Sequence, residues 1–139
     1  MTQELLVAGL VLAADRYSKA AVSERLCSGR VFSVGPCLRL RYVLTRFQTS
    51  GVLHGPTLLA VIWTTAAAML AIAAHSGMFF RSPAAQMGLA VALAGSGSNL
   101  YDRLRRGAVV DFLDLGWWPT FNLADIALVA GIVIALCFI

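Results

Sequence analysis

Four long apolar stretches alternate with more polar segments along this chain of 139 residues. They cover approximately residues 4–22, 56–75, 84–104 and 121–139. Each is close to the roughly 20 residues with which an α-helix crosses the hydrocarbon core of a bilayer. The pattern therefore predicts an all-α integral membrane protein, with four transmembrane helices in a single domain.

The segment between the first two stretches, residues 23–55, has a different pattern. Arginine recurs there too often for a membrane span, and the apolar runs are short and interrupted by Gly35-Pro36. Residues 38–42 read LRLRY, a partial alternation of apolar and basic side chains that is typical of a strand. We expect a small extended or β-like segment at the membrane surface here. In the connection 105–120 we expect an extended stretch or a short turn.

The composition also favours a membrane protein. Hydrophobic residues make up 59% of the chain and charged residues only 13%, so a soluble fold would lack polar side chains to cover its surface. The formal net charge is +4, and Lys19 is the only lysine. Because no aromatic-studded basic face accompanies the arginines, nucleic acid is excluded as a partner and anionic lipid head groups are favoured.

The cysteines do not form a metal-binding pattern, because Cys27 and Cys37 lack nearby histidines and Cys137 lies in an apolar tail. Free thiols are favoured over a Cys27–Cys37 disulfide, which stays open if that segment faces an oxidising compartment. The first apolar stretch does not read as a cleaved signal peptide, since Glu4 precedes it and no basic segment does.

Polar residues within the predicted spans indicate a function, because an ionisable side chain is costly there. Asp15 and Lys19 are four residues apart, on one helical face and in the favourable order of acid before base, so we expect them to pair. Asn122 can cap the last helix, and Asp125 lies in its first turn, near the positive end of the helix dipole.

Carboxylates are the reactive groups that the sequence offers. It contains no Ser-His-Asp set, and no cysteine has a histidine close by in sequence. The last two predicted helices are joined by a short connection and are therefore antiparallel, which brings Asp111 and Asp125 to the same membrane face. Two aspartates that meet there can share one proton, with one activating water and the other acting as acid to a peptide carbonyl.

The sequence neighbours of the aspartates suggest different roles. Asp111 lies in the apolar run VVDFL without an adjacent cation, so it is the better candidate for a shifted pKa. Asp102, close to Asn99 and Arg103, is expected to stay ionised and to orient other groups, whereas Asp114 is expected to be solvated. The alternative is that the acids only pair with the arginines after the third helix and hold a helical hairpin together.

Four motifs, in this order, resemble the lipoprotein signal peptidase family, also called signal peptidase II. They are DRYSK at 15–19, NLYDR at 99–103, VVDF at 109–112 and FNLAD at 121–125. The resemblance covers nearly the whole chain. It implies an intramembrane aspartyl endopeptidase, a multi-pass protein of the bacterial inner membrane, without metal or cofactor. It also implies that the substrate is a prolipoprotein, cleaved just before a diacylglyceryl-modified cysteine.

Residue by residue, the resemblance assigns the catalytic dyad to Asp111 and Asp125, in agreement with the choice from their neighbours. The positions that match supporting or substrate-binding residues are Asp15, Lys19, Asn99, Asp102, Arg103, Asn122 and Ala124. The implied partners are the prolipoprotein signal peptide and membrane lipids, and we expect a monomer. One segment departs from the family: residues 44–51 read LTRFQTSG, where an Asn-x-Gly-Ala-Ala-Phe-like motif usually contacts the substrate backbone.

Two other functions and the orientation stay open at this stage. A non-catalytic paralogue that binds a lipidated or membrane peptide as an accessory subunit would fit the missing asparagine. A small proton or solute carrier would use the intramembrane acids, but inverted repeats are not visible. By the positive-inside rule the arginine-rich segments 23–55 and 104–119 would be cytoplasmic; the resemblance places them outside, and we adopt that orientation.

Overall fold

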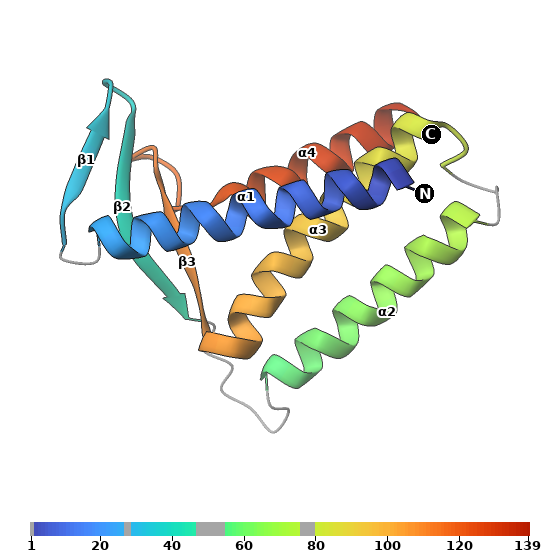
Figure 1. Cartoon of the computed structure of the whole chain (residues 1–139), viewed down its shortest axis with the longest axis horizontal. Helices are drawn as coiled ribbons and strands as arrows, with labels where there is room; N and C mark the ends of the chain where they lie inside the picture. The colour runs from blue at the N-terminus through green and yellow to red at the C-terminus, as the bar shows by residue number, and fades with distance from the viewer. Residues whose placement is uncertain (1, 27–28, 47–54, 76–79) are drawn as a thin grey trace.

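The computed structural model describes residues 2–26, 29–46, 55–75 and 80–139 (Figure 1). These residues form four helices and a small antiparallel sheet, as the sequence predicts. The elements in chain order are α1 (Thr2–Leu26), β1 (Val31–Val34), β2 (Leu38–Arg46), α2 (Gly55–His75), α3 (Pro83–Arg106), β3 (Ala108–Asp114) and α4 (Leu123–Cys137).

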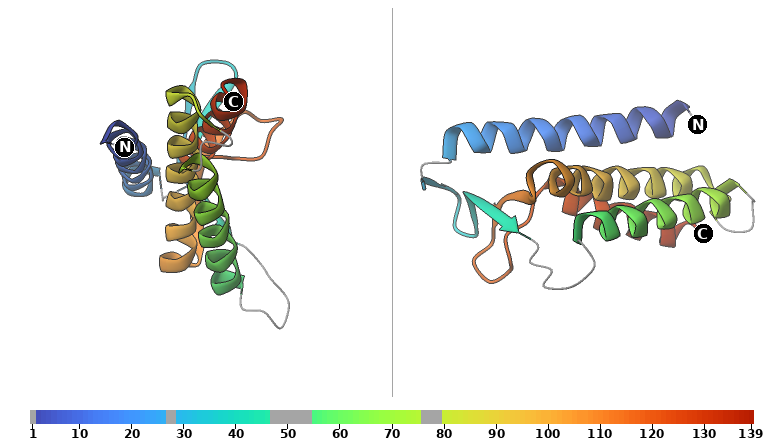
Figure 2. Two further views of the ribbon diagram at one scale, coloured as in Figure 1. Left: turned by 90° about the vertical axis from the view of Figure 1, so that its right-hand side faces the viewer. Right: turned by 90° about the horizontal axis from the view of Figure 1, so that it is seen from below.

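Helix α3 is the centre of the bundle and contacts each of the other three helices (Figures 1 and 2). Its closest neighbour is α4, which runs antiparallel to it: Gly88 lies against Ala135, whereas Gly95 lies against Ala124. A Cβ atom added at Gly88 would come within 2.6 Å of the Gly131 carbonyl oxygen and the Ala135 backbone nitrogen. Glycine is therefore required where these two backbones meet.

The ends of α3 follow the ordinary capping rules. Ser82 accepts a hydrogen bond from the Ala85 backbone N–H at 3.0 Å, and Pro83 occupies the first turn. At the other end Gly107 adopts φ 66°, and its N–H donates to the Arg103 carbonyl oxygen at 3.0 Å. This left-handed glycine ends the helix and turns the chain directly into β3.

The sheet has the order β1-β2-β3, with both pairs antiparallel. The hairpin of β1 and β2 is the β-like segment that the sequence predicts between the first two helices. β3 lies in the connection between α3 and α4, where the sequence indicates an extended stretch without revealing its partner. Its pairing with β2 joins segments more than 60 residues apart, so local sequence patterns carry no trace of it.

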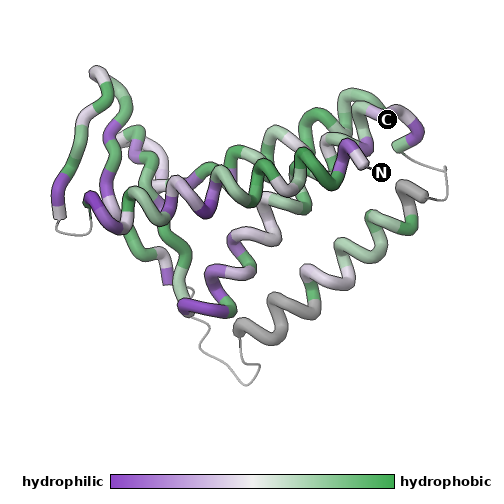
Figure 3. The backbone as a smooth tube through the Cα atoms, in the orientation of Figure 1, coloured by the Kyte–Doolittle hydropathy of each residue, from purple (hydrophilic) through white to green (hydrophobic). Residues whose placement is uncertain are grey.

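Polar and charged side chains are buried in this fold beside mostly small apolar ones, and large apolar side chains cover much of its outside. The buried residues of α1 are Asp15 and Lys19, whereas Leu5 and Leu10 on the same helix are about 70% exposed. Figure 3 shows hydrophilic residues gathered where α1 and α3 approach the sheet. Over the residues that the structure describes, none of the helices combines the length and the apolar character required of a membrane-crossing segment.

Two predictions concern the loops. Trp117 and Trp118 are both more than half exposed, with their rings 5.7 Å apart in an edge-to-face arrangement. Their role as a membrane-interface anchor stays a prediction. Cys37 is exposed, but Cys27 lies outside the described residues, and the Cys27–Cys37 disulfide therefore does too.

Candidate active site

The candidate site lies where the sheet meets the helices, and four elements contribute to it. β3 provides Asp111, and the start of α4 provides Asn122 and Asp125. α3 and α1 add the polar residues that the sequence places within their apolar runs. Of the nine residues predicted for the site, eight are joined by the hydrogen bonds described below, Ala124 through its backbone: Asp15, Lys19, Asn99, Asp102, Asp111, Asn122, Ala124 and Asp125.

Asn122 connects the two candidate catalytic carboxylates. Its side-chain Nδ2 donates to Asp111 Oδ1 at 2.6 Å, and its backbone N–H donates to Asp125 Oδ2 at 3.0 Å. In return Asn122 Oδ1 accepts from the Asp125 backbone N–H at 3.0 Å. The predicted N-cap is thus confirmed as a reciprocal capping box, and the same fully buried residue also holds the carboxylate of β3.

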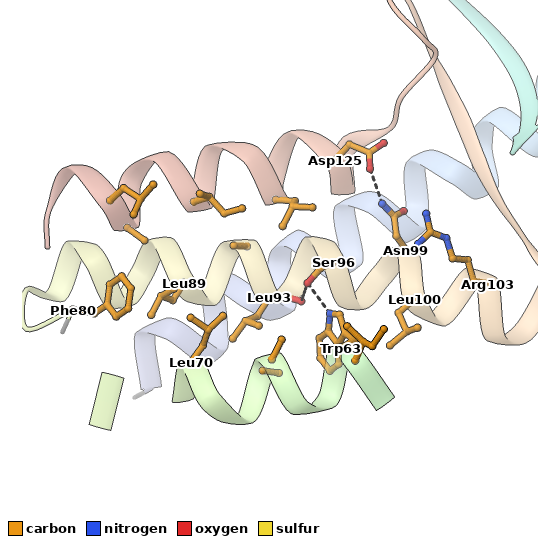
Figure 4. A pocket seen from close by; sticks show the side chains of 18 residues that line it. Trp63, Leu70, Phe80, Leu89, Leu93, Ser96, Asn99, Leu100, Arg103 and Asp125 are labelled. Carbon is orange, nitrogen blue, oxygen red and sulfur yellow. Dashed lines mark hydrogen bonds between the residues drawn. The ribbon is translucent and has the colours of Figure 1, made fainter. Parts of the chain in front are cut away.

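Asp125 is held from a second side by α3. Asn99 Nδ2 donates to Asp125 Oδ1 at 2.7 Å (Figure 4). Both oxygens of Asp125 therefore accept N–H bonds, at the positive end of the α4 dipole, an environment that suits a carboxylate. Asp125 and Asn99 also line a cavity of about 580 Å³ enclosed by α2, α3 and α4. The walls of this cavity are mostly apolar, so Asp125 stands at its polar end.

Asp111 has a different environment. The residue is 6% exposed, and burial raises its pKa above the ordinary value because it disfavours the charged form. Hydrogen bonds from Thr45 and Asn122 act in the opposite direction, and the nearby charge of Asp125 raises the pKa further. The direction is the one expected from the apolar run around Asp111 in the sequence.

Lys19 connects the polar residues that surround the two candidate catalytic carboxylates. Its Nζ atom lies 2.7 Å from Asp15 Oδ2 and 2.8 Å from Asp102 Oδ2, and it donates to Asn99 Oδ1 at 2.9 Å. The predicted Asp15–Lys19 pair is confirmed. Because Lys19 occupies the oxygen of the Asn99 amide, the NH₂ group of that amide must face Asp125. Lys19 thereby fixes which group Asn99 offers to the carboxylate.

Asp15 ties α1 to the beginning of α4. Its Oδ1 atom accepts the Ala124 backbone N–H at 2.9 Å, one of the donors that a helix start leaves without an intrahelical partner. Its Oδ2 atom accepts from the Ser98 hydroxyl at 2.6 Å. Ala124 is fully buried at this contact. A larger side chain there would push α4 away from α1 and α3, which gives the small residue at this predicted position a packing reason.

The partners of Asp102 were not foreseen from the sequence. They come from α1: Arg16 NH1 lies 2.9 Å from Asp102 Oδ1, and Lys19 holds the other oxygen. Arg16 also lies over the ring of Tyr101, 4.1 Å from its centroid. Sequence spacing indicates only Asn99 and Arg103, the neighbours of Asp102 on its own helix. Arg103 itself lines the cavity beside Asp125.

The prediction for Asp114 is wrong. It was expected to be solvated, but it is 4% exposed, with Arg41 at 3.1 Å and Arg39 at 3.4 Å, and it accepts the Gly116 backbone N–H at 2.8 Å. The reason is strand pairing, because Arg39 stands directly opposite Asp114 in the sheet. Asp114 therefore joins β3 to β2, and its loss would affect the fold as well as the charge.

Thr45 is a further residue of the site that was not predicted from the sequence: its hydroxyl donates to Asp111 Oδ2 at 2.5 Å. Thr45 lies in the segment 44–51, where this chain lacks the family's asparagine. Asp111 and Asp125 thus receive their hydrogen bonds from neutral groups, an arrangement suited to proton transfer rather than to a structural ion pair. Within the part of the chain that the structure describes, no three His, Cys, Asp or Glu residues group in a way that could hold a metal ion.

Fold and site together define a helical protein with two adjacent carboxylates where a small sheet meets its helices. Two solved structures share this fold, both described as bacterial membrane enzymes determined by the in meso method. One, at 2.3 Å resolution, is 25% identical, with a TM-score of 0.78 over 99% of this chain and 87% of that chain. The other, at 1.9 Å, is 24% identical, with a TM-score of 0.82 over 99% and 92%.

Relatives of known name are closer in sequence. The lipoprotein signal peptidase of Moorella thermoacetica is 41% identical over 96% of this chain and 89% of its own length. That of Pelotomaculum thermopropionicum is 36% identical over 91% and 84%. Residues 7–139 match the family described as signal peptidase (SPase) II, and the chain belongs to this family. The resemblance found in the sequence is thereby confirmed, together with its enzyme class, a hydrolase of the aspartic peptidase type in a bacterial membrane.

Proposed function

We propose that this protein cleaves the signal peptide of diacylglyceryl-modified prolipoproteins, with Asp111 and Asp125 as its catalytic dyad. The observation that carries the proposal is the position of Asn122, which donates to both carboxylates and so keeps them together. The names of the relatives, lipoprotein signal peptidases, supply the substrate class.

The surroundings of the two aspartates support unequal roles in a dyad that shares one proton. Asp111 is buried and its pKa is raised, so the proton resides there and Asp111 acts as the acid toward the scissile carbonyl. Asp125, which accepts N–H bonds on both oxygens, acts as the base and takes a proton from the attacking water. When the intermediate collapses, Asp125 gives the proton taken from water to the leaving amine, and Asp111 takes its own proton back from a hydroxyl group of the intermediate.

The apolar cavity beside Asp125 supports the proposed substrate. Leucine and isoleucine side chains of three helices line it, among them Leu89, Leu93, Leu128 and Ile132. Such walls suit the apolar stretch of a signal peptide or the acyl chains of its modified cysteine. A substrate lying in this cavity would pass Asp125 at the polar end, where cleavage takes place.

The distribution of exposed side chains supports a multi-pass position in the bacterial inner membrane. Outward-facing apolar residues follow the helices, and on α4 they include Ile126, Val129 and Val133. Apolar faces of this extent are covered by lipid when polar and small residues fill the interior. The sheet and Trp117-Trp118 would then lie at the outer surface of the membrane, the orientation adopted from the family.

Anionic lipid head groups are proposed as further partners. A groove of about 710 Å³ between the end of α1 and the hairpin is lined by Arg25 and Arg30 together with Val31 and Phe32. Cations beside exposed apolar side chains match the boundary between head groups and acyl chains. The monomeric state stays a prediction.

The function is tested by incubating the purified protein in lipid with a diacylglyceryl-modified prolipoprotein and looking for the cleaved product. The same prolipoprotein with an unmodified cysteine is the matched control, and we expect it to be cleaved poorly. Binding of the lipidated substrate without cleavage would contradict the peptidase proposal and favour the accessory-subunit alternative.

A further inference from the structure

We infer that Thr45, near the end of β2, is a positioning residue for Asp111: its hydroxyl group holds the Asp111 carboxyl in the orientation that the dyad requires. The inference rests on the proposed function, because it assigns a role toward one of the two proposed catalytic aspartates. It also gives a role to the segment in which this chain departs from its family.

The geometry fixes both oxygens of Asp111. Thr45 Oγ1 donates to Oδ2 at 2.5 Å, and Asn122 Nδ2 donates to Oδ1 at 2.6 Å. A carboxyl group has a broad, soft torsion about its last bond, so a single hydrogen bond leaves it free to swing. Two short hydrogen bonds, one from the sheet and one from the cap of α4, remove that freedom. Asn122 alone would not.

An irregularity in the sheet brings Thr45 to this place. Leu40 pairs with Leu113, but Val43 pairs with Asp111, so β2 advances three residues while β3 advances two. The register shift is that of a β-bulge at Arg41-Tyr42.

Without the bulge, Tyr42 would stand opposite Asp111, and Thr45 would project from the other face of the sheet. With it, Val43 stands opposite Asp111, and Thr45 lies two residues further on the same face, as a diagonal neighbour within side-chain reach. The one extra residue of the bulge thus brings the Thr45 hydroxyl within hydrogen-bond distance of the Asp111 carboxyl. Bulges are common next to active sites because they re-aim side chains in this way.

A hydroxyl group is a suitable hydrogen-bond partner for a carboxyl group that is protonated and deprotonated during the reaction. It donates to the ionised form and, after rotating, accepts from the protonated form, whereas an amide has separate donor and acceptor ends. Thr45 is exposed while Asp111 is buried, so the contact closes the open side of the carboxyl.

The charged groups that act on Asp111 are Asp125 of α4, which raises its pKa, and Lys19 of α1, which lowers it. The hydrogen bond from Thr45 also lowers the pKa, by stabilising the charged form. Removing that hydrogen bond must therefore raise the pKa of Asp111, and the basic limb of the pH–activity profile, which reports loss of the Asp111 proton, must move to higher pH.

The test compares Thr45→Val with Thr45→Ser on the full-length protein in lipid. Valine keeps the branched shape and the strand preference and loses only the hydroxyl. We expect Thr45→Val to lower kcat by about 10- to 100-fold with KM little changed, and to move the basic limb to higher pH. Thr45→Ser should restore most of kcat and the wild-type profile. Ser33→Ala, an exposed hydroxyl on β1, is the control and should behave as wild type.

Wild-type kcat and pH profile in Thr45→Val would overturn the inference. Equal losses in the valine and serine variants would overturn it too, since serine keeps the hydroxyl, and the loss would then not follow from the hydroxyl group. Asp111→Asn separates this from a failure of the proposed function. If Asp111→Asn is inactive and Thr45→Val is normal, only the role of Thr45 fails; if Asp111→Asn is active, the dyad itself is wrong.

Discussion

At the scale of single residues, the site is organised by amides rather than by charges. Asn122 touches both proposed catalytic carboxylates, and Asn99 holds the second of them. Neutral donors orient a carboxyl without fixing its charge, so the pair keeps the freedom to exchange a proton. Lys19 makes no direct hydrogen bond to the dyad among the bonds described; it is linked to Asp125 by hydrogen bonds through Asn99.

The first prediction concerns the dyad. Asp111→Asn and Asp125→Asn should each lower cleavage by about 10²- to 10⁴-fold, because an amide cannot transfer the proton. Asp111→Asn should change thermal stability little, because the amide has nearly the same shape as the acid. Asp125→Asn should also cost about 1–3 kcal/mol of stability, because its NH₂ group would face one of the two N–H donors that now bond to Asp125. Cleavage of a modified prolipoprotein and thermal unfolding, measured on the same preparations, check both parts.

The control for lost charge in this experiment is Glu24→Gln, an exposed acid on α1, which should keep full activity. Asp114→Asn does not serve this purpose, because Asp114 is buried against Arg39 and Arg41 and its loss disturbs the sheet. Full activity in either dyad variant would refute the assignment of the two aspartates.

At the scale of elements, buried ion pairs attach α1 to the rest of the bundle. Asp15 and Lys19 are the only buried residues of this helix within the described chain, and their partners lie on α3 and at the start of α4. A helix surrounded by lipid gains little from apolar contacts with other helices, so polar contacts and close packing determine where it lies.

The second prediction follows for Lys19. Lys19→Met leaves Asp15 and Asp102 facing each other without their shared cation and should cost about 3–5 kcal/mol of stability. The double change to Asp15→Asn with Lys19→Met should cost less than the sum of the two single changes, by about 1–3 kcal/mol, because it also removes one of the unpaired acids. Thermal unfolding of the three variants in one detergent measures the coupling.

Arg25→Met, an exposed cation on the same helix, is the matched control and should leave stability unchanged. If the single losses add without coupling, Lys19 and Asp15 do not act as a pair, and α1 is held by other contacts.

The third prediction concerns the contact between α3 and α4. A Cβ atom at Gly131 would come within 2.5 Å of the Ala92 backbone nitrogen and the Gly88 carbonyl oxygen, so Gly131→Ala must separate the helices and should cost about 1–3 kcal/mol. Gly9→Ala on α1 is the control, because its Cβ would meet nothing within 4 Å. That change should be neutral or slightly stabilising, by up to about 1 kcal/mol. Equal stability of the two variants in thermal unfolding would contradict the close packing.

At the scale of the whole molecule, the fold is turned inside out relative to a water-soluble protein. Its buried set contains Asp15, Lys19, Asp102 and Asn122, while large apolar side chains face outward along the helices. This arrangement is stable only where the surroundings are apolar, because the exposed leucines and isoleucines would otherwise meet water. The site consequently lies where the apolar helical part ends and the arginine-bearing sheet begins.

The fourth prediction concerns the orientation of this molecule in the membrane. Single cysteines at Ser33 on β1 and at Thr120 before α4, introduced after replacing the native cysteines, should both react with a membrane-impermeant thiol reagent in cells whose outer envelope is permeable to it. Labelling at neither site before lysis, and at both after it, would reverse the orientation and support the positive-inside rule for this chain.

Features of this protein that depend on local spacing can be predicted from the sequence. The length of the apolar stretches located the four helices, the spacing of four residues paired Asp15 with Lys19, and the position of Asn122 before Asp125 specified a cap. Such features involve residues within one or two helical turns, so their geometry follows from the backbone of one element. The motifs around the aspartates also gave the family.

Contacts that depend on the register between distant segments cannot be predicted in this way and are seen only in the folded protein. The pairing of β2 with β3 buried Asp114 against Arg39, and the bulge in β2 brought Thr45 to Asp111. Likewise, the position of α1 beside α3 allows Arg16 to form an ion pair with Asp102. A shift of one residue in a strand reverses the face of every side chain that follows, and no local pattern records that shift. The interaction partners of these aspartates therefore depend on strand register and helix position, which follow from the packing of the whole fold.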